Sequence, residues 1–188
     1  MAYNKDGNLE TLLREIFGYS NFRPGQLEII EAIQENHNVL AVMPTGAGKS
    51  LCYQLPAISS KRKTIIISPL VALIDDQVAA LSQLGVQVSK IHSGLSREEN
   101  VEQWRRFASD SSNILYLSPE RLMQPRMIDA LQRYSVGMFV IDEAHCISKW
   151  GTDFRPDYQE LSKLKMLLRR LITDYLIQMT EIFTLIIL

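Results

Sequence analysis

The stretch "NVLAVMPTGAGKS", residues 38–50, decides the fold class, because a short apolar run leads directly into a glycine-containing loop. Residues 38–44 are typical of a buried strand, and a helix is expected to open at the end of the loop. Gly46 and Gly48 let the backbone curl so that its N–H groups face phosphate oxygens. "MPTGAGKS" therefore predicts a phosphate-binding loop, although Met43 stands where the usual pattern has Gly or Ala. The alternative is a glycine-rich turn that carries a surface lysine.

The residues of this loop have separate predicted tasks. Lys49 would reach the β- and γ-phosphates of a nucleotide, and the Ser50 hydroxyl would ligate Mg²⁺. The start of the following helix adds positive partial charge beside the phosphates. The predicted phosphate-binding set is Thr45, Gly46, Ala47, Gly48, Lys49 and Ser50.

Further along the chain, apolar runs alternate with stretches of helical spacing. The apolar runs are residues 64–69, 88–93, 114–119 and 137–143, and the helical stretches are residues 70–84, 97–108 and 120–134. Nearly continuous apolar runs are typical of strands that are buried on both faces. This alternation predicts an α/β fold, a parallel sheet with helices on both faces, in which ligands bind at the carboxyl ends of the strands. Pro44, Pro69 and Pro119 would end three of the strands.

An acid pair, Asp142 and Glu143, follows the last of these apolar runs. An Asp at a strand end can hold Mg²⁺, usually through water, and a neighbouring Glu can orient and deprotonate an attacking water. The alternative is an acidic strand end that caps the next helix. The pair alone is weak evidence, but together with the upstream loop it indicates nucleotide hydrolysis, with Ser50 and Asp142 as the magnesium ligands.

Composition is that of one soluble globular domain, with 46% apolar residues, 22% charged residues and a net charge of −1. This charge argues neither for nor against nucleic-acid binding. Cys52 and Cys146 are far apart and form no CxxC motif, so two reduced thiols are expected, and no disulfide or zinc site. The N-terminus has neither the basic nor the apolar region of a secretory signal, and a cytoplasmic location is expected.

The chain divides into three predicted regions, residues 1–36, 37–165 and 166–188. The first contains two helices, Leu9–Phe17 and Gln26–Glu35, and the second contains the sheet. The third is an apolar tail without Gly or Pro whose spacing predicts a helix. Charged residues interrupt the tail, so a membrane span of about 20 apolar residues is not expected. Two readings stay open for the tail: a helix packed on the sheet, or an exposed segment that is prone to self-association.

Several motifs together resemble those of RecQ-type DNA helicases. They are "FRPGQ", "MPTGAGKSLCYQLPA", "SPLVALIDDQV", "SPERL" and "DEAHCISKWGTDFRPDY", in the family's order. The resemblance covers Leu9 to Lys165 and identifies residues 37–165 as the first RecA-like P-loop NTPase lobe. It implies an ATP-dependent DNA helicase of 3′-to-5′ polarity, with ATP and Mg²⁺ as cofactors and single-stranded or partly duplex DNA as partner. It also implies a role in DNA repair and recombination, at the nucleoid of a bacterium or in the nucleus of a eukaryote.

The resemblance also assigns roles to residues that the pattern alone does not single out. Tyr19 would stack on the adenine, Gln26 would read the base edge with its amide, and Arg23 would support that site. Without the resemblance, these would be a core tyrosine, a helix-start glutamine and a surface arginine. His145 would couple the nucleotide site to the moving parts, whereas His37 and His92 keep structural roles.

DNA contacts are implied in two places. The residues Trp150, Phe154 and Arg155 resemble the family's aromatic-rich loop, where bases stack on aromatic faces. The alternative for the two aromatics is packing beneath a loop. The residues at strand ends that would face the DNA backbone are Ser68, Pro69, Ser118 and Arg121.

The chain departs from the family after Lys165. A helicase needs a second RecA-like lobe with an arginine finger, and the tail contains no Ser/Thr-Ala-Thr motif. The 188-residue chain alone is therefore expected to bind nucleotide weakly, to hydrolyse it slowly and not to unwind DNA. Two alternatives are a non-catalytic ATP- or DNA-binding fragment and an inactive truncated product whose sheet lacks its final strands. A small-molecule P-loop kinase is remote, because it would not account for residues 150–155.

Overall fold

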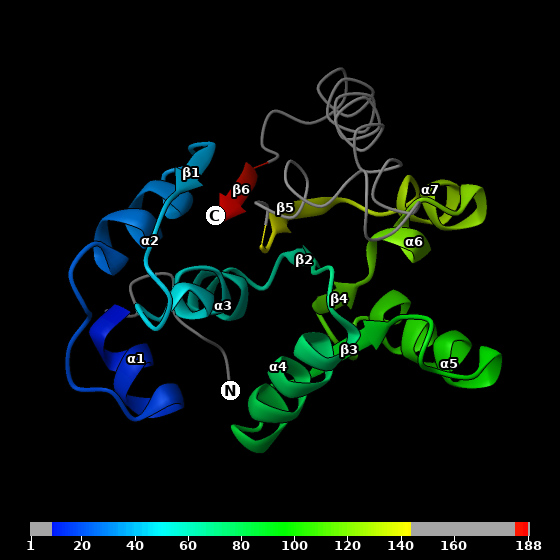
Figure 1. The fold of residues 1–188 in the computed structure, drawn as a ribbon, viewed down its shortest axis with the longest axis horizontal. Coiled ribbons are helices and arrows are strands. Elements are labelled where there is room, and N and C mark those ends of the chain that lie inside the picture. The colour runs from blue at the N-terminus through cyan, green and yellow to red at the C-terminus, as the bar shows by residue number, and fades with distance from the viewer. Residues whose placement is uncertain (1–8, 144–182, 188) are drawn as a thin grey trace.

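The structure, a computed structural model, describes residues 9–143 and 183–187, which form one parallel sheet with helices on both faces (Figure 1). The strands are β1 (Val39–Ala41), β2 (Lys63–Ile67), β3 (Val88–Ile91), β4 (Ile114–Leu117), β5 (Val136–Ile141) and β6 (Phe183–Ile187). The helices are α1 (Leu9–Phe17), α2 (Gln26–Gln34), α3 (Lys49–Ser60), α4 (Val71–Gln83), α5 (Arg97–Ala108), α6 (Pro119–Leu122) and α7 (Pro125–Leu131). This confirms the predicted α/β fold class.

The strand order is β1-β6-β5-β2-β4-β3, and all five pairings are parallel. Crossovers that run toward the β3 edge pass through α3 or α4, and those that run back pass through α5 or through α6 and α7. The two groups of helices cover opposite faces, as a single crossover handedness requires. The loops after β1 and β5 consequently open at the same edge of the sheet.

Each face of the sheet has its own apolar core. Ile65 and Ile67 of β2 pack with residues of α5, α6 and α7, whereas Ile66 packs with residues of α2, α3 and α4. A third cluster joins α1 to α2 and α3, on the outer side of the phosphate-loop helix. Because side chains alternate along a strand, a run such as Thr64–Ile67 has to be apolar or small at nearly every position to fill both cores.

The predicted helix over residues 120–134 is in fact two short helices, α6 and α7. Pro125 explains the break, because it has no backbone N–H to continue α6 and it disfavours helical dihedrals at Gln124. Gln124 is extended, with φ −67° and ψ 127°, and Pro125 opens α7 at its first position. The prediction of one continuous helix is therefore wrong here.

The tail contributes an interior strand to the sheet, next to the edge strand β1. Leu185 of β6 is opposite Val39 of β1 on one side and Val140 of β5 on the other. The prediction of a helical tail is wrong for residues 183–187, and β6 occupies the place between β1 and β5 that the alternative of a truncated product would leave open. The physical reason is that β1 and β5 both offer backbone hydrogen bonds to a strand placed between them, and "FTLII" is rich in β-branched residues. Residues 166–182 lie outside the described part.

None of the helices in the described ranges is long and apolar enough to cross a membrane.

Candidate functional site

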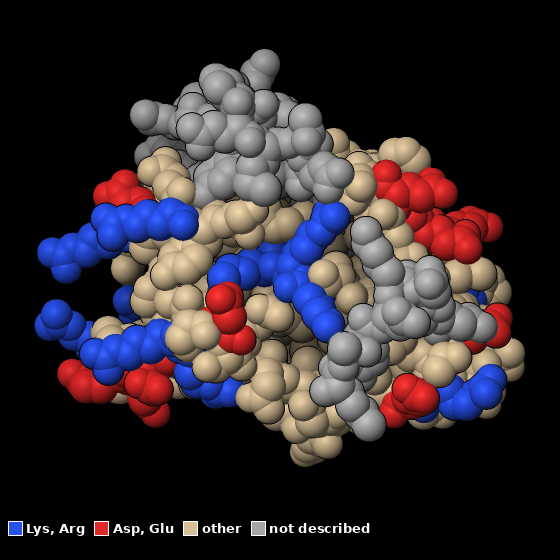
Figure 2. Space-filling view, turned by 180° about the vertical axis from the view of Figure 1, so that it is seen from behind, with Lys and Arg blue, Asp and Glu red and all other residues tan. Residues whose placement is uncertain are grey.

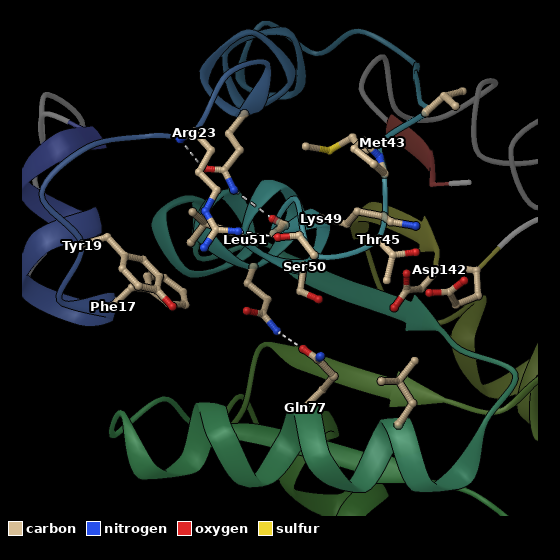
Figure 3. Close-up of a pocket in the computed structure, with 18 of the residues that line it drawn as sticks. Phe17, Tyr19, Arg23, Met43, Thr45, Lys49, Ser50, Leu51, Gln77 and Asp142 are labelled. Carbon is tan, nitrogen blue, oxygen red and sulfur yellow. Dashed lines mark hydrogen bonds between the residues drawn. The ribbon is translucent and has the colours of Figure 1, made fainter.

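A cavity of about 780 Å³ lies at the carboxyl edge of the sheet (Figure 3). Its size is within the range of small-molecule sites. The phosphate loop, the link between α1 and α2, and the end of β5 all contribute to its wall. The predicted site residues that line it are Tyr19, Arg23, Gln26, Thr45, Gly46, Gly48, Lys49, Ser50, Asp142 and Glu143. Two motifs that are far apart in the sequence therefore meet in one cavity.

The phosphate loop needs its glycines for two different reasons. Gly46 and Gly48 both have φ 80°, which side chains other than glycine rarely adopt. At Gly48 a Cβ atom would also stand 2.5 Å from the Gln26 side-chain nitrogen. Gly48 is the residue before Lys49, at which α3 begins, so the lysine and Ser50 start their helix at the cavity wall.

Two side chains from the link and from α2 hold the outer side of the loop. The Gln26 Nε2 donates to the carbonyl oxygens of Ala47 at 3.1 Å and Gly48 at 3.0 Å, and its Oε1 accepts from the Arg23 backbone N–H at 2.8 Å. The Arg23 guanidinium donates to the Gly46 carbonyl. Gln26 is only 2% exposed, so this amide is part of the folded structure and not a surface group.

The hydrogen bonds from Gln26 to the loop carbonyls also determine where the backbone N–H groups of the loop point. In a planar trans peptide, the C=O and the following N–H point in opposite directions. With the Ala47 and Gly48 carbonyls turned toward Gln26, the N–H groups of Gly48 and Lys49 point away from it. Gln26 therefore fixes the orientation of the two peptide groups that directly precede α3. To contact the edge of a base as predicted, the Gln26 amide would have to give up at least one of its hydrogen bonds to the loop and form one to the base instead.

Asp142 is buried at the end of β5, with an exposed fraction of 5%. Its Oδ2 accepts from the Tyr53 hydroxyl at 3.1 Å, and its Oδ1 accepts from the Glu143 backbone N–H at 3.0 Å. Burial raises the pKa of the Asp142 carboxyl above its ordinary value, and the hydrogen bond from Tyr53 opposes that rise. Such a carboxylate favours a nearby cation, because a positive charge offsets the cost of burying a negative one.

Glu143 has a left-handed backbone, with φ 53°. Residues other than glycine adopt this conformation at a cost, and such positions cluster at functional sites. The turn separates the two acids, because Asp142 is buried while Glu143 is half-buried and lines the cavity. The separate roles that the sequence suggests for the two acids stay a prediction.

The donor set of the cavity fits magnesium. Mg²⁺ is typically held by one or two carboxylates together with phosphate oxygens and water, without an all-protein cage. Asp142 and Ser50 supply a carboxylate and a hydroxyl to the same cavity. Over residues 9–143 and 183–187, no group of three or more His, Cys, Asp or Glu side chains could hold a metal ion on its own.

The predicted DNA-facing residues of the strand ends lie elsewhere on the same edge. Ser68 follows β2 and Ser118 follows β4, two neighbouring strands, and each serine is only 1% exposed. The Ser118 hydroxyl bonds the Glu120 carboxylate at 2.5 Å, whereas the buried Ser68 Oγ and Arg121 Nε have no hydrogen-bond partner. Pro69 is also buried. The structure thus places these four side chains at one edge but mostly beneath its surface.

Several sequence predictions fall outside the described residues. These are the roles of His145, Trp150, Phe154 and Arg155 and the reduced state of Cys146, and all of them stay predictions. Cys52 is described, and it is a buried thiol whose pKa burial raises to about 11. His92 is also buried, with its Nε2 3.0 Å from Asp75, which agrees with a structural role.

Sequence reasoning missed three polar side chains next to the site, Tyr53, Gln54 and Gln77. The Gln54 Nε2 donates to the Gln77 Oε1 at 2.6 Å and to the Tyr116 hydroxyl at 3.0 Å. Gln54 and Gln77 line the cavity, and Gln77 comes from α4 (Figure 3). Helical spacing from Lys49 could have indicated Tyr53, which follows it by four residues, but nothing in the sequence pairs Gln54 with Gln77.

Charge on the molecular surface is mixed. Figure 2 shows Lys and Arg side chains gathered near the centre of one face, with Asp and Glu side chains beside them and toward the edges. This distribution is consistent with the net charge of −1. On this face the surface charge alone therefore does not indicate a partner.

Comparison with known proteins finds one matching family model and several similar proteins. A family model described as DEAD/DEAH box helicase matches residues 23–179. The chain is 43% identical over 161 residues to the probable ATP-dependent DNA helicase RecS of Bacillus subtilis, covering 84% of this chain and 32% of the relative. It is 44% identical over 156 residues to the ATP-dependent DNA helicase RecQ of the same organism, covering 82% of this chain and 26% of the relative. The chain thus spans about a third of these relatives or less.

Solved structures agree on the fold. A hypothetical ATP-dependent RNA helicase from Sulfolobus tokodaii superposes with a TM-score of 0.69 at 21% identity, over 95% of this chain and 49% of that one. The DUF1998 helicase MrfA bound to DNA and AMPPNP gives a TM-score of 0.71 at 18% identity, over 100% of this chain and 26% of that one. At such identities the likeness establishes the fold alone. The resemblance to RecQ-type helicases rests on the curated relatives, which confirm it.

Proposed function

The chain belongs to the DEAD/DEAH box helicase family, and from this premise we propose that it is the first motor lobe of a RecQ-type ATP-dependent DNA helicase. Residues 1–36 would hold the adenine-recognition link, and residues 37–165 the ATP-binding lobe. The observation that carries the proposal is the single cavity in which the phosphate loop meets Asp142 and Glu143. The function of the whole protein would be hydrolysis of ATP coupled to 3′-to-5′ translocation on single-stranded DNA, in repair and recombination at the nucleoid or in the nucleus.

At the phosphate end of the cavity, each residue has a distinct proposed task. Lys49 binds the β- and γ-phosphates, and Glu143 orients the attacking water and accepts its proton. Ser50 and Asp142 hold Mg²⁺, which when bound neutralises charge on the phosphates. His145, which lies outside the described residues, would transmit the state of the nucleotide to the rest of the motor.

At the opposite end, Tyr19, Arg23 and Gln26 form the proposed adenine site. Tyr19 is 54% exposed at the cavity wall, which leaves a ring face available for stacking on a base. The Gln26 amide can donate and accept at once, as the edge of adenine requires. Since this amide holds the phosphate loop in the structure, binding of the base and the shape of the loop would be linked through one side chain.

Gln26→Glu is expected to remove the preference for ATP over GTP and to weaken binding of both. A carboxylate cannot donate to the Ala47 and Gly48 carbonyls, and it would lie about 3 Å from two oxygens. Nucleotide affinity should fall by about tenfold or more, because two hydrogen bonds of about 1 kcal/mol each are lost from the loop. Isothermal titration with Mg·ATP and Mg·GTP measures both effects. Gln34→Glu, at an exposed position of the same helix, is the matched control, and a Gln26→Glu chain with intact discrimination would argue against the adenine site.

For DNA, the proposed contacts are the strand ends with Ser68, Pro69, Ser118 and Arg121 and the loop with Trp150, Phe154 and Arg155. In the first group, the buried Arg121 Nε and Ser68 Oγ have no hydrogen-bond partner, although buried polar atoms normally have one. Each atom would have to become exposed before it could donate to a phosphate oxygen. The second group lies outside the described residues and stays a prediction from sequence.

The experiment that tests the proposal is ATP hydrolysis with and without single-stranded DNA. We expect very slow turnover by residues 1–188 alone, because an arginine finger, which the resemblance places in a second lobe, typically contributes about 10³ to 10⁵ in rate. Single-stranded DNA should raise that rate, and strand displacement should be undetectable. A hydrolysis rate that is the same with and without single-stranded DNA would argue against a helicase lobe. Unwinding by the pure chain would show that a second lobe is not required. Binding without any turnover would favour the alternative, a non-catalytic fragment.

A further inference from the structure

A buried phenol next to the acid pair has no task in the proposed function. The Tyr53 side chain is 0% exposed, and its hydroxyl donates to the Asp142 Oδ2 at 3.1 Å. Buried hydroxyl groups usually have a hydrogen-bond partner, so the presence of a partner is not in itself informative. The identity of the partner is. Here the partner is the carboxylate that is proposed to bind magnesium, 89 residues away in the sequence.

The position of Tyr53 in α3 ties this contact to the phosphate loop. Tyr53 follows Lys49 by four residues, so the two lie about one turn apart on the same side of the helix. Ser50, the other proposed magnesium ligand, is three residues before Tyr53. Through Tyr53, the helix that carries Ser50 is therefore joined to the Asp142 carboxylate.

The two oxygens of Asp142 are held from opposite sides. The Glu143 backbone N–H binds Oδ1, and Tyr53 binds Oδ2. With both bonds in place, the carboxylate plane is fixed relative to α3 as well as to β5. Without the phenol, the carboxyl group would keep only the contact to its own turn. Outer partners of this kind orient metal ligands and typically change metal affinity by about 10- to 100-fold.

We propose that Tyr53 is a positioning residue of the magnesium site, which holds the Asp142 carboxylate in one orientation relative to the helix that carries Ser50. The inference rests on the proposed function of the cavity. Tyr53 itself does not contact the nucleotide or the metal. Tyr53 links α3, which begins at the phosphate loop, to β5, which ends at Asp142. The distance between the phosphate loop and the acid is thereby held constant.

The test compares nucleotide affinity with and without magnesium. The ratio of the dissociation constant of a fluorescent ATP analogue in EDTA to that in Mg²⁺ measures what the metal adds to binding. In Tyr53→Phe the ring still fills the same space, and only the hydroxyl is lost. We expect this ratio to fall by about 10-fold or more, while the affinity in EDTA stays at the wild-type value.

Thr64→Val is the matched control. Thr64 is also 0% exposed, and its hydroxyl donates to the Arg62 carbonyl at 3.3 Å near the amino end of β2, away from the cavity. Loss of this hydroxyl should lower the melting temperature without changing the ratio of the two affinities. A Tyr53→Phe chain with the wild-type ratio, or a Thr64→Val chain with the same fall, would overturn the inference.

Two further arms separate this inference from the proposed function. If wild-type chain binds the analogue equally with Mg²⁺ and EDTA, the magnesium site itself is absent and the proposed function fails. In Asp142→Asn, adding Tyr53→Phe should cause no further fall in the ratio, because the phenol acts through the carboxylate. If Tyr53→Phe does not fold, 3-fluorotyrosine at position 53 keeps the packing and donates more strongly. It should then change the ratio at least a few-fold, and an unchanged ratio would overturn the inference.

Discussion

Lys49→Ala is expected to abolish the stabilisation that Mg·ATP gives to the chain. In wild type, nucleotide at about 100 times its dissociation constant should add about 2.7 kcal/mol to the free energy of unfolding. For a chain of this length, that corresponds to a rise in melting temperature of about 5 to 10 °C. Lys49 lines the cavity at the start of α3, and without its charge the phosphates lose their only lysine or arginine contact from the loop itself. Thermal melts followed by circular dichroism, with and without Mg·ATP, measure the shift.

Lys61→Ala is the control for this experiment. Lys61 is exposed and lies at the other end of α3, so its removal should leave the nucleotide shift intact. A Lys49→Ala chain that keeps the full shift would mean that nucleotide binds outside the cavity. If wild type melts cooperatively but shows no shift, the lobe folds and its cleft needs a second half before it can bind.

Leu185→Pro is expected to cost about 3 kcal/mol of folding free energy or more and to abolish cooperative melting in a marginally stable chain. Leu185 is at the centre of β6, which has a hydrogen-bonded strand on each side. Proline removes a backbone donor and leaves a buried acceptor without a partner, which costs about 1–3 kcal/mol, and its ring adds a steric conflict in an interior strand. Urea unfolding followed by circular dichroism measures the loss.

Leu185→Val provides the matched comparison, because valine keeps the backbone donor and favours strands. It should change the free energy of unfolding by less than about 1.5 kcal/mol. If proline and valine gave the same stability, β6 would not be an interior strand in solution. The tail would then return to the helical or exposed readings that the sequence suggests.

Local patterns were sufficient to predict that the phosphate loop and the acid pair lie at the same edge of the sheet. The loop around Gly48 and the acid at Asp142 each follow an apolar strand, and parallel strands bring their carboxyl ends to one edge. The sequence therefore predicts that the two motifs meet, and the cavity contains both. Strand ends were also predictable, because Pro69 and Pro119 come two residues after the last residues of β2 and β4.

The remaining features depend on contacts between distant segments, which periodicity cannot report. The spacing of Leu168, Leu171 and Tyr175 predicts a helix, but whether "FTLII" pairs as a strand depends on the edges that β1 and β5 offer to it. The bonds from Gln26 to the loop carbonyls and from Tyr53 to Asp142 join residues that are 21, 22 and 89 positions apart. Their geometry becomes visible only when the chain is folded.

The place of β6 has a consequence for the order in which the chain can mature during synthesis. Among the described strands, β1 hydrogen-bonds only to β6, although β1 is made early and β6 is made last. The strand that leads into the phosphate loop therefore cannot join the sheet until Phe183–Ile187 have left the ribosome. Contacts between such distant parts of a chain form slowly, and an unpaired edge exposed in the meantime invites association with other chains. In a nascent chain, the wall of the cavity would thus be completed in one late step, when β6 joins β1 to the rest of the sheet.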